Sequence, residues 1–271
     1  MKADQDSSRY ALIMEQIFLS RYMPGSREIA FEREDITRTA AELGVVLPKN
    51  LGDVLYSFRS RRQLPAAVRA TEPTGEEWII VSVGRSKYRF ELTRQATVRP
   101  NPLIAEIKAP DATPGLIALY TQGDEQALLA RLRYNRLIDI FTGVTCYSLQ
   151  SHLRTTVRAM GQVETDELYV GVDRKGAHYV FPVQAKGGSD ALGTVQIRQD
   201  FALCAEKFPT LTCRPIGAQF MTGGVIALFE FTQVGHDVSL SPENPEKHYR
   251  LVPMNEMTAA DLEQYRHQGA H

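Results

Sequence analysis

The stretch that decides the fold is ETDELYVGVDRKGAHYVFPVQAK, residues 164–186. Two apolar runs flank a turn at residues 174–176, which is the pattern of a β-hairpin. Side chains alternate between the two faces of a strand, so Gln184 and Lys186 are expected on one face and Ala185 on the other. Such a hairpin can bring an acid, an amide oxygen and an amine together at one end of a sheet.

The carboxylates at the start of the hairpin cannot all serve one metal ion. Alternation places Glu164 and Asp166 on one face and Glu167 on the other. We expect Asp166 to be the catalytic, metal-binding acid, with Glu167 as its rival and Glu164 as possible support. Because Mg²⁺ takes oxygen ligands and keeps several waters, Asp166 and the amide oxygen of Gln184 would hold it weakly. Lys186 would then orient water or stabilise charge on a phosphate.

The chain on either side of the hairpin alternates helical and extended patterns. Leu149, Leu153 and Val157 recur at a spacing of four and predict a helix from about 145 to 160, which would carry Gln150 toward the cleft. The other predicted elements are helices at about 124–141 and 194–207, the latter bearing Gln196, strands at 212–221, 225–231 and 248–252, and a last helix started by Thr258 with Asp261 as its capping-box partner.

Helix, β-hairpin, helix and strand in this order, with Gln184-Ala185-Lys186 in the second hairpin strand, resemble the PD-(D/E)xK or restriction-endonuclease-like nuclease superfamily in its Mrr-type form. The resemblance covers about residues 145–231. It implies a mixed sheet flanked by helices and a Mg²⁺-dependent endonuclease that hydrolyses DNA phosphodiesters, with Mn²⁺ as a substitute ion. It also implies that Gln184 stands where most members have an acid, and it suggests a role in restriction or defence.

The N-terminal third of the chain has a different pattern. It predicts helices at 10–22, 34–43 and from Pro48 to about 62, and strands at 28–31, 78–83 and 87–92, which is the order of a winged helix-turn-helix domain. Residues 54–99 hold nine basic and four acidic residues. The basic side chains expected to contact DNA are Arg59, Arg61 and Arg62 at the end of the third helix and Arg85, Lys87 and Arg89 on the hairpin.

These patterns predict a two-domain α/β (α+β) protein. The winged-helix domain would span residues 1–92, a proline-rich linker 93–123, and the nuclease-like mixed-sheet domain 124–271. A single site cuts one DNA strand, so cleavage of both strands favours a homodimer.

Composition limits the class of protein and the compartment in which it is expected. The 271 residues are 43% hydrophobic with a net charge of −1, so a sizeable core is expected and a global basic field is excluded. Cys146, Cys204 and Cys213 form neither a zinc pattern nor a disulfide framework. We expect a cytoplasmic protein with no membrane segment, because the start is polar and no stretch approaches ~18 apolar residues.

Two other functions fit the same patterns. Gln184 in place of an acid is compatible with a non-catalytic DNA-binding regulator whose nuclease-like domain has lost activity. A repair nuclease acting on branched DNA would need the same residues. The sequence leaves the choice between these functions and restriction open.

Overall fold

The protein is described here from a computed structural model that covers residues 2–48, 51, 54–55, 57–58, 63–120, 125–158, 160–187 and 190–268. The chain divides into two compact units. The N-terminal unit comprises Met1–Val98 with Arg154–Val163 and Gly193–Leu203, and the C-terminal unit comprises Arg99–Leu153, Glu164–Leu192 and Cys204–His271.

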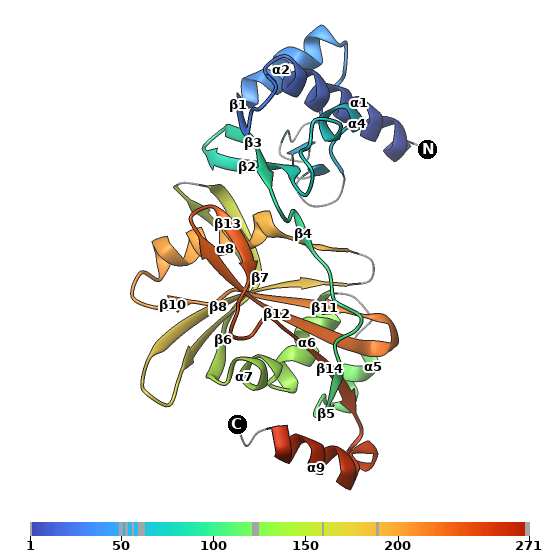
Figure 1. Cartoon of the computed structure of the whole chain (residues 1–271), viewed down its shortest axis with the longest axis vertical. Coiled ribbons are helices and arrows are strands. Elements are labelled where there is room, and N and C mark those ends of the chain that lie inside the picture. The colour runs from blue at the N-terminus through green and yellow to red at the C-terminus, as the bar shows by residue number, and fades with distance from the viewer. Residues whose placement is uncertain are drawn as a thin grey trace. The chain divides into compact units, whose positions relative to one another are not determined.

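Helices and a small sheet build the N-terminal unit (Figure 1). Its elements are α1 (Lys2–Leu19), β1 (Glu28–Glu32), α2 (Arg33–Glu42), α4 (Ala66–Arg69), β2 (Glu77–Gly84) and β3 (Lys87–Thr93). The antiparallel strands lie in the order β1-β3-β2. The predicted strands and first two helices are therefore confirmed, although α1 begins earlier than expected. The predicted third helix lies largely outside the described part of the chain.

An aromatic cluster holds this unit together. The ring of Phe18 packs edge-on against Trp78 and Phe90, with centroids 5.1 Å and 5.2 Å away. Phe31 lies 4.8 Å from Phe90 on the same face of the sheet. All four side chains are buried. Aromatic rings bury a large apolar area each, so this cluster contributes strongly to the core of the unit.

A nine-stranded mixed sheet flanked by helices dominates the remainder. Seven strands form its main path in the order β5-β14-β12-β11-β8-β7-β6. Strand β8 pairs in parallel with β11 and antiparallel with β7. The elements not yet named are β4 (Thr97–Val98), β5 (Glu106–Pro110), α5 (Gly115–Tyr120), α6 (Glu125–Tyr134), α7 (Leu137–Thr142), β6 (Thr145–Val157), β7 (Gly161–Val172), β8 (His178–Lys186), β9 (Leu192–Gly193), α8 (Thr194–Lys207), β10 (Thr212–Cys213), β11 (Ile216–Phe220), the 3₁₀ helix η2 (Thr222–Gly224), β12 (Val225–Val234), β13 (Asp237–Leu240), β14 (Glu246–Val252), the 3₁₀ helix η3 (Met254–Glu256) and α9 (Ala259–Gln268).

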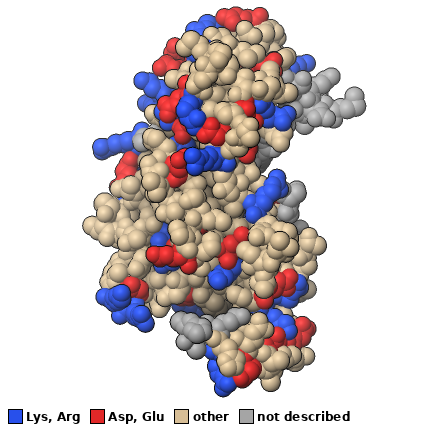
Figure 2. All heavy atoms as spheres, in the orientation of Figure 1, with Lys and Arg blue, Asp and Glu red and all other residues tan. Residues whose placement is uncertain are grey.

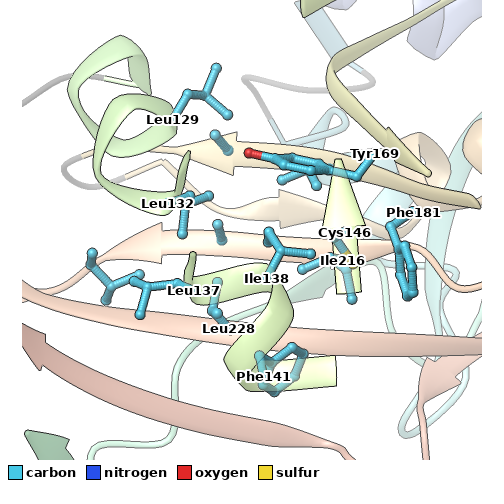
Figure 3. Close-up of a cluster of buried hydrophobic side chains, with 14 of the residues drawn as sticks. Leu129, Leu132, Leu137, Ile138, Phe141, Cys146, Tyr169, Phe181, Ile216 and Leu228 are labelled. Atoms are coloured by element: carbon cyan, nitrogen blue, oxygen red, sulfur yellow. The ribbon is translucent and has the colours of Figure 1, made fainter. Parts of the chain in front are cut away.

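The two faces of the large sheet bury separate clusters. On one face Leu132 of α6 and Ile138 of α7 pack against Tyr169 and Phe181 of the hairpin (Figure 3). On the other face Leu168 and Val180 pack against Cys204 at the C-terminal end of α8. Alternation along β7 and β8 thus assigns odd positions to the first face and even positions to the second.

The hairpin, α8 and the capped last helix were predicted correctly. Helix α8 has the expected bounds, and the hairpin turn lies at residues 173–177. Thr258 and Asp261 form the expected reciprocal cap, in which the Asp261 N–H donates to the Thr258 hydroxyl at 3.1 Å and the Thr258 N–H donates to the carboxylate at 2.9 Å.

The helix predicted at 145–160 was wrong. Residues Thr145–Val157 form strand β6 at the end of the sheet, next to β7. A spacing of four places Leu149, Leu153 and Val157 on one face of a helix, but it is also an even number and so places them on one face of a strand. Pairing with β7 decides between the two.

The stretch predicted as a linker contains regular structure. Strand β5 pairs in parallel with β14 and belongs to the large sheet, and α5 follows it. Among the helices of the described chain, none is long and apolar enough to cross a membrane.

Candidate functional site

The hairpin brings the predicted acid to the Gln-x-Lys segment. Glu167 pairs with Val183 and Tyr169 with Phe181 in the antiparallel register. Where this ladder ends, one oxygen of the half-buried Asp166 carboxylate, Oδ2, accepts the backbone N–H of Ala185 at 2.8 Å. Ala185 lies between Gln184 and Lys186, so the carboxylate is held against the segment that the sequence singled out.

The amide of Gln184 is held by the neighbouring strand. Its side chain is 1% exposed, and its Nε2 donates to the backbone carbonyl of Glu164 at 3.1 Å. In that bond the nitrogen end of the Gln184 amide is the donor to the neighbouring strand. Glu164 is half-buried, and its backbone carbonyl is the acceptor of this bond.

Lys186 contacts a carboxylate that the sequence did not single out. Its ammonium lies 3.2 Å from Oε1 of Glu125, the first residue of α6, and 3.0 Å from the carbonyl of Ala185. The lysine side chain is 13% exposed and that of Glu125 is 41% exposed. The only sequence signal for Glu125 was its place at the start of a predicted helix, which says nothing about its neighbours.

A second glutamine lies next to Lys186. Gln219 on β11 pairs with Lys186 in the parallel register, and its Nε2 donates to the carbonyl of Asp190 at 2.7 Å. Its Oε1 is buried, and no described residue hydrogen-bonds to it. The site therefore gathers two carboxylates, two amides and one ammonium from α6, β7, β8 and β11.

Glu167 lies on the opposite face of the sheet. It is fully buried, and its Oε1 accepts hydrogen bonds from Arg133 Nε and Nη2 at 3.0 and 2.8 Å and from the Ser148 hydroxyl at 2.6 Å. Burial, and then the charge of Glu167, raise the pKa of the Tyr169 hydroxyl. Because Glu167 belongs to this cluster, we assign the proposed metal-binding role to Asp166.

The residues fit a weakly held cation better than a closed metal cage. Within the part of the chain that the structure describes, no three His, Cys, Asp or Glu side chains lie together as a metal site. No described residue donates a hydrogen bond to Asp166 Oδ1. This carboxylate oxygen can therefore serve a cation. One carboxylate oxygen and an amide oxygen are hard ligands of the kind Mg²⁺ uses, with waters and substrate phosphate completing the shell.

The predicted DNA contacts fall into three groups. Arg85 and Lys87 are exposed at the β2–β3 turn. Arg89 is half-buried and ion-paired, 2.7 Å from Glu28 and 2.6 Å from Glu91. Arg59, Arg61 and Arg62 lie outside the described residues.

The supporting residues also differ in position. Gln150 is exposed on strand β6, not on a helix, and Gln196 is half-buried on α8. On the face shown in Figure 2, basic and acidic side chains are interspersed, and neither sign dominates.

Comparison with known proteins adds no further assignment: no protein-family model, curated protein or solved structure matches this chain.

Proposed function

We propose that this protein is a Mg²⁺-dependent endonuclease that hydrolyses phosphodiester bonds in DNA. The observation that carries the proposal is the 2.8 Å contact between the Asp166 carboxylate and the backbone of the Gln184-Ala185-Lys186 segment. An acid, an amide and an amine then share one end of a sheet, an arrangement that suits metal-assisted phosphoryl chemistry.

The order of elements around this contact supports the proposal. Helix α7, strands β6, β7 and β8, helix α8 and strand β11 occur in this order along the chain, with the two-residue strands β9 and β10 before and after α8, and β11 pairs in parallel with β8. The hairpin, helix α8 and strand β11 keep the order on which the resemblance to PD-(D/E)xK nucleases rests, but strand β6 stands where the helix before the hairpin was expected. In the N-terminal unit, helices and a β1-β3-β2 sheet support a winged-helix DNA-binding role.

Each residue has a stated task in the proposal. Asp166 and Gln184 would hold Mg²⁺, which supplies Lewis-acid chemistry at the phosphate when bound. Lys186 would donate hydrogen bonds to a phosphate oxygen and stabilise the negative charge that develops there. Glu125 keeps the ammonium in place before substrate arrives, because the two groups are 3.2 Å apart.

The test is cleavage of plasmid, linear, methylated and branched DNA with Mg²⁺ or Mn²⁺. We expect the parent protein to cut at least one substrate, and Asp166→Asn and Lys186→Ala to lose at least about 10²-fold in rate, because each removes charge stabilisation at the reacting phosphate. Mn²⁺ binding in the presence of uncleavable DNA, followed by electron paramagnetic resonance, should weaken in Asp166→Asn and persist in Lys186→Ala.

The same hairpin supplies matched controls at its other end. Asp173 accepts the Lys175 N–H at 2.8 Å in the turn, far along both strands from Asp166. Asp173→Asn and Lys175→Ala repeat the two chemical changes without touching the site, so both should cut at the parent rate. Equal loss in these variants would contradict the proposal.

One observation favours the non-catalytic alternative. Lys186 already has a carboxylate partner, and Gln184 contributes no negative charge to a cation. A DNA-binding regulator is the conclusion if the parent protein binds DNA but cuts none of the substrates with either ion.

A further inference from the structure

Strand β6 is the last strand on one side of the large sheet. It is 13 residues long and follows β7 as the last strand of the path. In the structure as described, β7 is its only partner strand. A long edge strand presents backbone donors and acceptors to any second strand that approaches, and proteins usually block such edges.

The first part of β6 itself lacks the charged residues and proline that block many sheet edges. Residues 145–153 read TCYSLQSHL and contain no Asp, Glu, Lys, Arg or Pro. Tyr147 and Leu149 are 61% and 53% exposed, although both are large apolar residues on the same face. The Cys146 N–H already donates to the Asp139 carboxylate at 2.9 Å. His152 has a φ of +49°, which interrupts the regular strand, so the pairing segment is limited to about residues 147–151.

The other end of the sheet is protected. Strand β5 has only five residues, carries Glu106 and Lys108, and ends at Pro110, which cannot donate a hydrogen bond. Charge, short length and proline all discourage edge pairing. The contrast between the two edges indicates that β6 is left open for a partner.

We propose that the partner is a second copy of this chain, joined by antiparallel pairing of β6 with its own symmetry mate. A two-fold contact places a strand against its reversed copy, so any charge near the centre would face a like charge. An uncharged segment avoids that repulsion in every register, and exposed Tyr147 and Leu149 supply cross-strand apolar pairs. A charged peptide would find no complementary charge among the side chains of residues 147–151.

This inference is independent of the nuclease proposal, since it rests on the edge of the sheet and not on Asp166. The two proposals are compatible, because a dimer carries two sites and could cut both strands of a duplex.

The test is the mass of the full chain in solution, measured by sedimentation velocity over a wide concentration range. We expect a dimer for the parent. Leu149→Lys or Tyr147→Lys places like charges across the two-fold contact and should raise the dimer dissociation constant by about tenfold or more. Leu262→Lys is the matched control, since Leu262 is 58% exposed on α9 and outside the edge.

Circular dichroism identifies any variant that fails to fold, and the two lysine variants on β6 substitute for each other in that case. Dimers in the parent and in Leu262→Lys, with monomers in the β6 variants, support the proposal. It is overturned by a monomeric parent at all concentrations, by a folded β6 variant that remains dimeric, or by equal dissociation of Leu262→Lys.

Discussion

Glu91 is the centre of a buried ion network in the N-terminal unit, and its removal should destabilise that unit more than removal of its partner Arg198. The Glu91 carboxylate lies 2.9 Å from Arg198 Nη1 and 2.6 Å from Arg89 Nη2. Arg89 also contacts Glu28 at 2.7 Å. The side chains of Glu91, Arg198 and Arg89 are only 10%, 5% and 20% exposed, so solvent screens their interactions weakly.

The two substitutions leave different charges behind. In Arg198→Met the Glu91 carboxylate keeps Arg89, so the loss is that of a charged hydrogen bond, about 1.5–3 kcal/mol. In Glu91→Gln the buried Arg198 loses the only carboxylate that contacts it among the described residues, and an uncompensated buried charge costs about 3–5 kcal/mol. The double variant should cost less than the sum of the two, because neither charge remains.

The single tryptophan makes the assay specific to this unit. Trp78 is 4% exposed and packs in the aromatic cluster, so its fluorescence reports unfolding of the N-terminal unit under urea. We expect the midpoint to fall in the order parent, Arg198→Met, Glu91→Gln. The reasoning is refuted if Arg198→Met is the more destabilised variant, or if neither midpoint moves.

The same network gives a pH dependence. Burial opposes ionisation of Glu91, but hydrogen bonds and charge from Arg198, and then from Arg89, outweigh it and hold the pKa of the carboxyl below its ordinary value. A carboxyl whose pKa is lower in the folded state stabilises the fold at pH values above its unfolded pKa of about 4.3. This stabilisation is lost as the pH falls through the folded pKa. The loss of stability of the N-terminal unit on acidification, followed by Trp78 fluorescence, should therefore be smaller in Glu91→Gln than in the parent.

Three further predictions concern the C-terminal unit. Gly217→Ala should cost about 1–3 kcal/mol in calorimetry, because its new Cβ would lie 2.6 Å from a buried leucine methyl, whereas Gly115→Ala, with nothing within 4 Å, should be near neutral. Hydrogen bonds from Thr258 lower the pKa of Asp261 to about 2, so the NMR titration of this carboxyl should begin only in strong acid, and Thr258→Ala should raise its midpoint. The stabilisation from the cap is complete above the ordinary pKa of the carboxyl and is lost as the pH falls through the lowered value. Burial raises the pKa of the Cys146 thiol to about 11, so thiol reagents should label it slowly at neutral pH until the protein unfolds, and fast labelling of the native protein would contradict this.

The sequence predicted those elements that are stabilised by residues close together in the chain. The hairpin follows from two apolar runs around a turn in which the Asp173 carboxylate accepts the Lys175 and Ala177 N–H groups. The C-terminal cap follows from Thr258 and Asp261, three residues apart. In each case the interacting groups are neighbours along the chain, so no knowledge of the rest of the fold is needed.

Assigning the candidate site required both the sequence pattern and the tertiary structure. Alternation along β7 already separated Asp166 from Glu167, but only the packed sheet shows that Glu167 is enclosed with Arg133 while Asp166 lies at the Gln184-Ala185-Lys186 segment. The pairing of Lys186 with Glu125 joins residues 61 apart in the chain and has no sequence signature.

The amino-acid sequence by itself determined which segments form turns, which strand residues share a face and which residues cap a helix, since these features depend on side chains a few residues apart. Only the tertiary structure decided that residues 145–157 extend as an edge strand and that Arg198 reaches Glu91 from 107 positions away. The physical reason is that an even apolar spacing satisfies a helix and a strand equally well, and pairing with β7 in the folded sheet supplies the energy that separates them.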